Sequence, residues 1–149
     1  MEQLESFIKS QRVLTLATKD WSKPWISNVY YWYQDGVFYF ISLVDAQHSQ
    51  QILQNNSIAF STVRYNKSDH TDRKSLQWTG ICKQATDEKS IALWVWLHNH
   101  YFPQFAERIT VGRVLEDVNR AVWMILPNTI KFWNDELYWI NGTCIFDFS

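Results

Sequence analysis

Hydroxyl and imidazole side chains gather where an apolar run ends and a polar helical segment begins. Ser42 closes the run Val37–Ser42 (VFYFIS), and the following segment, Ala46–Leu53, carries His48 and Ser49. A helix N-terminus presents free backbone N–H groups and the positive end of the helix dipole, so it favours a bound anion. The sequence therefore predicts a phosphate-binding corner here, although an ordinary polar helix start would contain the same residue types.

Three further positions stand out because their surroundings are of a different kind. Ser27 and Asn28 interrupt the aromatic run Pro24–Tyr33 (PWISNVYYWY), where they either line a ligand or satisfy a β-bulge. Gln77 lies in an alternating apolar strand, so it either faces inward and needs a partner or lies on a solvated face. Trp133 is either a core residue or a ligand contact.

Metal and thiol chemistry have weak support. His98 and His100 are two residues apart on a predicted helix, so their side chains point apart, and no carboxylate or cysteine cluster completes a metal site. Cys82 and Cys144 lack a neighbouring His or Lys that would stabilise a thiolate. We therefore expect no metal and no nucleophilic cysteine.

The composition bounds the class of protein. A chain of 149 residues is long enough for one domain with a core, here residues 1–149. The 14 basic and 15 acidic residues are scattered, so we expect no nucleic-acid partner. Two cysteines are too few for a disulfide framework, the first residues have no apolar signal core, and no apolar run approaches the ~20 residues of a membrane helix. A cytoplasmic protein without a membrane segment is the expectation.

Aromatic residues make up 17% of the chain, and a domain of this size has a limited interior in which to bury them. They either build a β-rich core, where aromatics are favoured, or line a pocket or an interface. Both uses remain open.

Short strand-like runs separated by turns carry these side chains. A polar turn at 19–23 follows Val13–Thr18, and the Asp-Gly pair at 35–36 predicts a hairpin turn. Residues 64–75 predict a long mobile hairpin loop, and Gly80 marks a bulge in the strand after it. The remaining predicted elements are helices at 2–11, Ala46–Leu53 and Asp87–Tyr101, and strands at Pro24–Tyr33, Val37–Ser42, Ile58–Val63, Leu76–Lys83, Ala121–Leu126, Ile130–Trp133, Leu137–Ile140 and Thr143–Phe148.

The helix predicted at Asp87–Tyr101 is apolar almost all round, so it must be buried on two sides. A partner subunit would be a reasonable source of the second cover. Many short strands with few helices favour a mainly β, antiparallel barrel over a doubly wound sheet.

This succession of elements resembles the pyridoxamine 5'-phosphate oxidase-like split barrels that bind FMN, in a branch other than the vitamin B6 oxidase itself. The likeness covers most of the chain, from Val13 to Val63, and continues at Leu76–Gly80 (LQWTG), Phe102–Phe105 (FPQF) and Ala121–Trp133. It implies an antiparallel Greek-key split barrel of six to eight strands with a few short peripheral helices. It also implies a homodimer with one flavin in each of two grooves along the interface.

The resemblance assigns cofactor-binding roles to eight residues. Ser42, His48 and Ser49 match the positions that face the flavin phosphate, and a protonated His48 would add a charge-assisted hydrogen bond. The remaining matches lie beneath the flavin ring or approach it, the last two from the partner chain: Ser27, Asn28, Val29, Gln77 and Trp133.

Two departures from the oxidase pattern narrow the expected activity. His48 stands where related oxidases often have Arg or Lys, so the resemblance implies a weaker and pH-sensitive hold on phosphate. Trp133 is followed by Asn134, Asp135 and Glu136 without the arginines of the oxidase's substrate motif. Oxidation of a phosphorylated B6 vitamer is therefore not expected.

Two function classes follow. The first is an FMN-dependent oxidoreductase-like protein acting on an unidentified small molecule, in which the flavin carries the chemistry. No residue is assigned as general acid or base, and Tyr31, Tyr33 and Asn28 are candidates by strand position alone. The alternative is a non-catalytic binder, sensor or carrier of flavin, haem or another planar ligand, and a third reading is a groove filled by its own aromatics.

Overall fold

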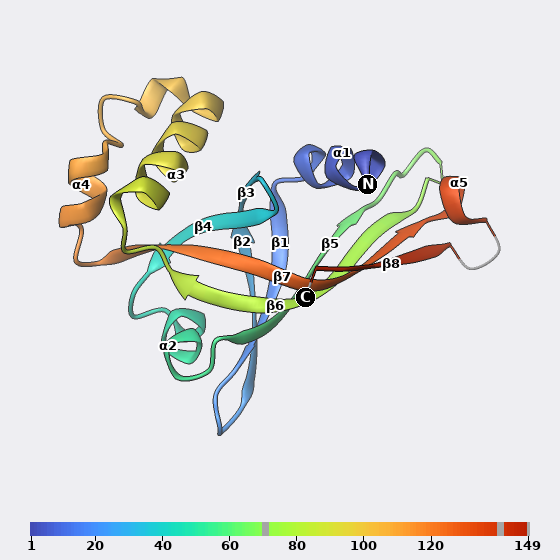
Figure 1. Ribbon diagram of the computed structural model, residues 1–149, viewed down its shortest axis with the longest axis horizontal. Helices are drawn as coiled ribbons and strands as arrows, with labels where there is room; N and C mark the ends of the chain where they lie inside the picture. Colours follow the sequence, from blue (N-terminus) through green and yellow to red (C-terminus); the bar gives the residue numbers. More distant parts are fainter. Residues whose placement is uncertain (70–71, 140–141, 149) are drawn as a thin grey trace.

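An eight-stranded antiparallel sheet forms the body of the protein, with helices at both ends, in a computed structural model that describes residues 1–69, 72–139 and 142–148 (Figure 1). Neighbouring strands follow the order β2-β1-β5-β6-β7-β4-β3, and β8 pairs with β7. This confirms the mainly β, antiparallel split-barrel fold. No helix in the described ranges is both long and apolar enough to cross a membrane. The strands are β1 (Val13–Lys19), β2 (Pro24–Tyr30), β3 (Trp32–Gln34), β4 (Val37–Leu43), β5 (Ser57–Arg64), β6 (Lys74–Gln84), β7 (Arg120–Asn134) and β8 (Thr143–Asp147), and the helices are α1 (Glu2–Ser10), α2 (Gln47–Gln54), α3 (Glu88–Tyr101), the 3₁₀ turn η1 (Pro103–Phe105), α4 (Val111–Glu116) and α5 (Asp135–Tyr138).

The inner face of the curled sheet holds the main core. Because successive strand residues point to opposite faces, alternate apolar residues gather there. Leu14 and Leu16 of β1 are fully buried, as is Phe38 of β4, whose ring contacts Phe60 and Trp78 with centroids 5.3 and 4.7 Å away. α1 covers one part of this core with three apolar side chains, which are Leu4, Phe7 and Ile8.

The turn predictions are confirmed. β1 and β2 pair up to Lys19 and Pro24, around the predicted turn at 19–23. Asp35 and Gly36 have φ values of 49° and 81°, the left-handed conformation that a two-residue type I′ hairpin requires. β5 and β6 stay paired to their ends, so the polar hairpin loop is residues 65–73, of which 70 and 71 lie outside the described residues.

Gly80 is confirmed as a bulge. The pairing of β6 with β7 shifts register between Thr79 and Gly80. A Cβ atom on Gly80 would lie 2.6 Å from the carbonyl oxygen of Leu126, so the two backbones approach too closely for any side chain.

Two strand predictions near the C-terminus are wrong. The runs Ala121–Leu126 and Ile130–Trp133 form one strand, β7, because Pro127 sits opposite the Gly80 bulge, where a proline is tolerated within a sheet. The run Leu137–Ile140 does not continue the sheet, since α5 occupies Asp135–Tyr138 and Ile140 lies outside the described residues. The Asn134 side chain starts this short helix by accepting hydrogen bonds from two backbone N–H groups, those of Glu136 and Leu137.

Helix α3 covers the opposite, outer face of the sheet over β3, β4 and the first half of β7. Trp94 and Ile91 pack there against Val122 and Tyr39 in a second apolar cluster. The other side of α3 meets α4, which belongs to the same chain and which the sequence did not predict (Figure 1). Much of the second cover expected from a partner subunit therefore comes from this chain.

Candidate functional site

The barrel is split between β2 and β4, which approach each other without pairing as strands. Sequence reasoning treats Pro24–Tyr33 as one strand, but it divides at Tyr31 into β2 and β3, the two edges of the sheet. The Tyr31 side chain turns into the core, where its hydroxyl donates to the carbonyl oxygen of Ile8. Its backbone N–H donates to the carbonyl oxygen of Arg12. The chain therefore stops pairing with β1 at Tyr31 and continues as β3, which pairs with β4.

His48 connects the two sides of this split. Its Nδ1 lies 3.0 Å from the hydroxyl of Ser27 on β2, and its Nε2 lies 2.7 Å from the hydroxyl of Ser42 on β4. α2 places the imidazole there because it begins directly after the end of β4. The structure therefore brings together three of the residues that the sequence analysis selects, in one hydrogen-bonded chain.

Burial lowers the pKa of His48 below its ordinary value near 6.5, so the imidazole is neutral at neutral pH. A neutral imidazole has one donor and one acceptor nitrogen, which matches two hydroxyl neighbours that can each donate or accept. Burial therefore disfavours the protonated His48 that the sequence analysis considers.

The lowered pKa predicts a pH-dependent stability. Below about pH 6.5 the unfolded chain takes up a proton that buried His48 resists, so the contribution of His48 is complete above that pH and is lost as the pH falls. We expect the free energy of unfolding of the wild type to decline more steeply between pH 7.5 and 5 than that of His48→Gln. Denaturant titrations at several pH values measure both slopes, and parallel profiles would exclude a neutral, buried His48.

A cavity of about 500 Å³ opens at the split beside His48. The two strand edges supply its walls, and Phe102 at the end of α3 supplies a third side. Most of its lining is apolar or aromatic, as in pockets that hold flat organic ligands. Its lining residues are Asn28, Val29, Tyr30, Trp32, Ile41, Ser42, His48 and Phe102.

The N-terminus of α2 adds uncompensated backbone donors next to this cavity. Its N-cap residue is Ala46, which makes no side-chain capping bond, and its first turn contains no acidic side chain. The first backbone N–H groups of a helix have no partner within the helix, so they can donate hydrogen bonds to a bound anion.

Four predicted site residues do not line the cavity. Ser27 lies beside it, hydrogen-bonded to His48, and the other three lie farther away. The Ser49 side chain is fully buried on the other side of α2, and its hydroxyl has no hydrogen-bond partner among the described residues. Gln77 lies exposed on β6 opposite Ser61 and Lys131, so its solvated alternative is the correct one in this protomer. Trp133 is 37% exposed near the far end of β7.

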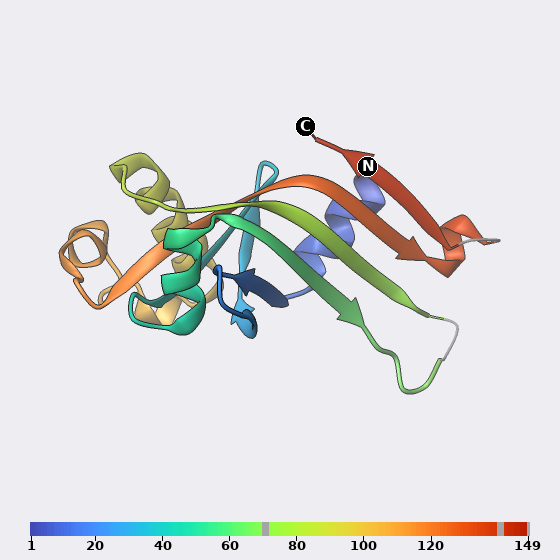
Figure 2. The same ribbon diagram turned by 90° about the horizontal axis from the view of Figure 1, so that it is seen from below.

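Gln77 and Trp133 nevertheless share the outer sheet face with Asn28. The strand register places Asn28, Thr15, Ser61 and Gln77 in one row across β2, β1, β5 and β6. Figure 2 shows β5, β6 and β7 running side by side from the α3–α4 end toward α5. The uncovered part of this face, which we call the outer patch, displays exposed apolar or small side chains at Val13, Ile26, Tyr30, Ala59, Val63, Trp133 and Ile145.

The cavity walls include residues that sequence reasoning missed. Tyr31 and Tyr33, candidates by strand position, both pack against the inner core, so their neighbours Tyr30 and Trp32 face the cavity instead. The alternation of side chains between the two faces of a strand could have identified Tyr30 and Trp32. It could be applied only with knowledge that the strand breaks at Tyr31. Ile41 and Phe102 meet the site from distant segments, and no local pattern marks them.

Other reactive side chains do not line this cavity. Burial raises the pKa of the Cys82 thiol, which disfavours a thiolate. Nδ1 of His98 is 3.1 Å from Oδ1 of the neighbouring Asn99. Within residues 1–69, 72–139 and 142–148, no three His, Cys, Asp or Glu side chains converge in a way that could hold a metal ion.

The sequence matches no protein-family model and no curated protein. Solved structures, however, share the fold. A haem-binding protein from Mycobacterium smegmatis superposes with a TM-score of 0.74 at 16% identity, over 98% of this chain and 57% of that one. HutZ, a haem storage protein from Vibrio cholerae, gives 0.64 at 15% identity, over 85% and 89% of the two chains. A FAD-binding protein from Mesorhizobium loti gives 0.65 at 16% identity, over 87% and 88%.

The chain thus spans little more than half the length of the mycobacterial protein, and its likeness to all three structures is one of fold. The chain has the split-barrel fold of the pyridoxamine 5'-phosphate oxidase-like superfamily.

Proposed function

We propose that the protein binds FMN in the cavity at the split and acts as an oxidoreductase on a small molecule. The observation that carries this proposal is the chain Ser27–His48–Ser42, which sets a polar corner against an otherwise apolar cavity. FMN likewise combines a polar phosphate with a flat, largely apolar ring, so its two parts match the two parts of the cavity. When bound, FMN would supply hydride or electron transfer.

The residues present fit such a ligand. Val29, Tyr30 and Trp32 offer a flat wall for the ring, and the buried indole N–H of Trp32 has no partner among the described residues. At the polar end, Ser42, neutral His48 and the uncapped start of α2 can donate to phosphate oxygens. No Lys or Arg lines this cavity, so neutral donors would carry the phosphate contact.

A homodimer would complete the site. The outer patch exposes Ile26, Val63 and Ile145 to 66%, 70% and 66%, which is unusual for three apolar residues on one sheet face. A second copy packed on this face would bury them and would bring its own Gln77 and Trp133 toward the first copy's Asn28. This arrangement accounts for predicted site residues that are far apart within one protomer.

A haem-binding or storage role is the second candidate. Two of the structures with this fold carry names that state haem binding or haem storage. An apolar cavity with aromatic walls suits any flat macrocycle, and the lack of Lys and Arg in its lining removes a feature that would favour FMN over haem.

The absorption spectrum of the purified protein separates these candidates. We expect the visible absorption bands of an oxidised flavin, and release of FMN on denaturation. A Soret band without flavin would favour haem. Oxidation of a reduced nicotinamide by the flavin-loaded protein would then distinguish an enzyme from a carrier.

His48→Ala tests the phosphate corner. We expect affinity for FMN to fall by roughly 1–3 kcal/mol, because the donor at the phosphate and the link between Ser27 and Ser42 are both lost. Affinity for riboflavin, which has no phosphate, should change little. Fluorescence titrations give both constants, with His100→Ala on the exposed end of α3 as the matched control. Equal losses for the two ligands would refute a phosphate role.

A further inference from the structure

A second cavity, of about 470 Å³, lies under the helical layer formed by α3 and α4. Its floor includes Ile41 of β4, which also lines the cavity at the split. The His98 ring contacts Trp32 and Trp94, with centroids 5.4 and 5.3 Å away, and so packs against one tryptophan from each cavity. The two cavities are therefore neighbours that share walls.

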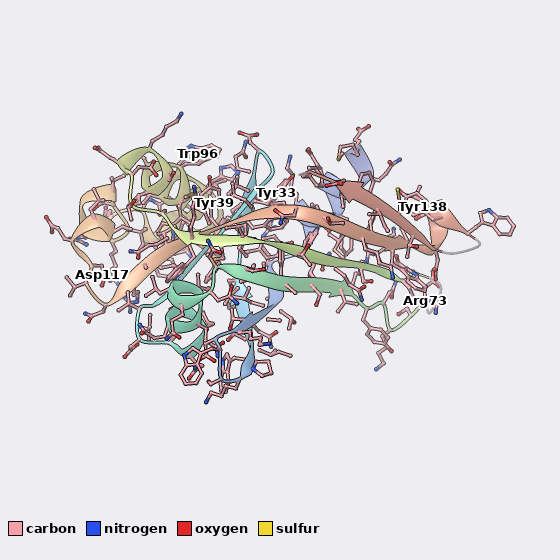
Figure 3. The ribbon with its side chains drawn as sticks, turned by 60° about the horizontal axis from the view of Figure 1, so that its bottom comes forward. Tyr33, Tyr39, Arg73, Trp96, Asp117 and Tyr138 are labelled. Atoms are coloured by element: carbon pink, nitrogen blue, oxygen red, sulfur yellow. The ribbon has the colours of Figure 1, made fainter. Side chains whose placement is uncertain are left out.

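The walls of this second cavity combine apolar and cationic side chains. Ile41, Trp94 and Ile109 supply the apolar part. Three arginines line the same space, and one carboxylate, Asp117, faces them. Asp117 lies at the α4 end of the molecule, far from the ion pairs around Arg73 (Figure 3). The three arginines are Arg108, Arg113 and Arg120.

Asp117 neutralises only part of this positive charge. Its Oδ2 lies 3.5 Å from the Arg120 guanidinium, and its Oδ1 accepts backbone N–H groups of the turn before β7. Arg113 donates to the carbonyl oxygens of Glu107 and Arg108 at 3.4 and 3.3 Å, which fixes its guanidinium beside the cavity. Arg108 makes no side-chain hydrogen bond or ion pair with any described residue.

Trp94 adds a donor to the same walls. Its side chain is 1% exposed, and its indole N–H has no partner among the described residues. Core tryptophans that touch neither cavity share this property, so the preference for an anion rests on the arginines. An apolar floor beside an excess of cations suits a molecule with an aromatic or aliphatic body and a negatively charged group.

We propose that this cavity binds a small amphipathic organic anion, a carboxylate or phosphate, and that this anion is the molecule on which the proposed flavin site acts. The inference rests on the proposed function for its reaction but not for its binding site. The anion's charged group lies at Arg108 and Arg113, and its apolar body lies over Ile41 toward the split. The two cavities differ in charge, because three arginines line the second and no Lys or Arg lines the first.

A pair of fluorescent probes tests this assignment. 8-Anilinonaphthalene-1-sulfonate carries a negative charge, and N-phenyl-1-naphthylamine has the same aromatic body without it. For Arg108→Gln we expect a roughly five- to twentyfold weaker affinity for the sulfonate and an unchanged affinity for the neutral amine, since a charge-assisted contact is lost. Lys89→Gln, an equal change of charge on exposed α3 outside the cavity, should leave both affinities unchanged.

The outcomes separate this inference from the flavin proposal. Equal losses for both probes, or an equal loss in Lys89→Gln, would overturn the anion site. Protein without flavin that still shows the Arg108-dependent sulfonate affinity would sink the proposed function and leave the anion site standing. Protein with bound flavin and no Arg108 effect would do the reverse. Flavin absorbance of Arg108→Gln is read in the same samples to verify that the first cavity is intact.

Discussion

Val63→Glu is expected to convert the proposed homodimer to a monomer and to abolish the proposed retention of flavin. Val63 is 70% exposed on β5 in the middle strands of the outer patch, so a charged side chain is tolerated in the isolated protomer. In a symmetric dimer both copies of the new carboxylate would be buried without partners, at a cost of about 3–5 kcal/mol each. The dimer dissociation constant should rise by at least about a hundredfold.

Val118→Glu is the matched control for this change. Val118 is 82% exposed in the turn before β7 and lies outside the sheet, so the same substitution there should alter neither mass nor flavin content. Light scattering at micromolar concentration and the ratio of flavin to protein absorbance measure both variants. A Val63→Glu protein that remains dimeric with full flavin content would place the interface, and the second half of the site, elsewhere.

Phe38→Ala is expected to lower the free energy of unfolding by about 3–5 kcal/mol. Phe38 is fully buried at the centre of the inner core, where its ring contacts those of Tyr31, Tyr33, Phe60 and Trp78. Removing the ring forfeits its burial and leaves a cavity that this rigid aromatic cluster cannot refill. For a domain of this size the midpoint of thermal unfolding should fall by roughly 6–20 °C.

Phe105→Ala provides the comparison within the same residue type. Phe105 is 42% exposed in η1, and its ring centroid lies 6.3 and 6.4 Å from those of His98 and Phe102. Its loss should cost about 1 kcal/mol or less, because much of the ring already contacts water. Denaturant titrations followed by circular dichroism rank the two variants, and equal losses would contradict a single dominant inner core.

The local signals of the sequence predict the elements of the barrel well. The Asp35–Gly36 pair requires left-handed backbone and marks its hairpin, and Gly80 marks the place where two strands approach too closely for a side chain. Pro127 misled because a proline normally interrupts a strand, and its tolerance depends on the bulge across the sheet. The predicted strand at 137–140 followed the β-propensity of its aromatic residues, whereas Asn134 caps a short helix there.

The site was only partly predictable, for a different reason. Ser27, Ser42 and His48 could each be selected as a polar residue at a distinctive place, and the resemblance joined them to one ligand. That a single neutral imidazole spans two strand edges follows from the curl of the sheet, which no local pattern encodes. The arginines of the second cavity left no signal either, because they come from a turn, a six-residue helix without marked periodicity and the first residue of β7.

The helical layer between β6 and β7 departs from and returns to adjacent points of the barrel. Gln84 pairs with Trp123, and the N–H of Ala85 donates to the carbonyl oxygen of Val122 at 2.8 Å, so the excursion starts and ends on one rung of the ladder. A substitute segment of different length could be grafted between those two points without disturbing the strand register. It would have to supply apolar side chains that cover Tyr39 and Met124. Exchanging the segment from α3 to α4 would then change which ligands the scaffold can bind while the barrel stays the same.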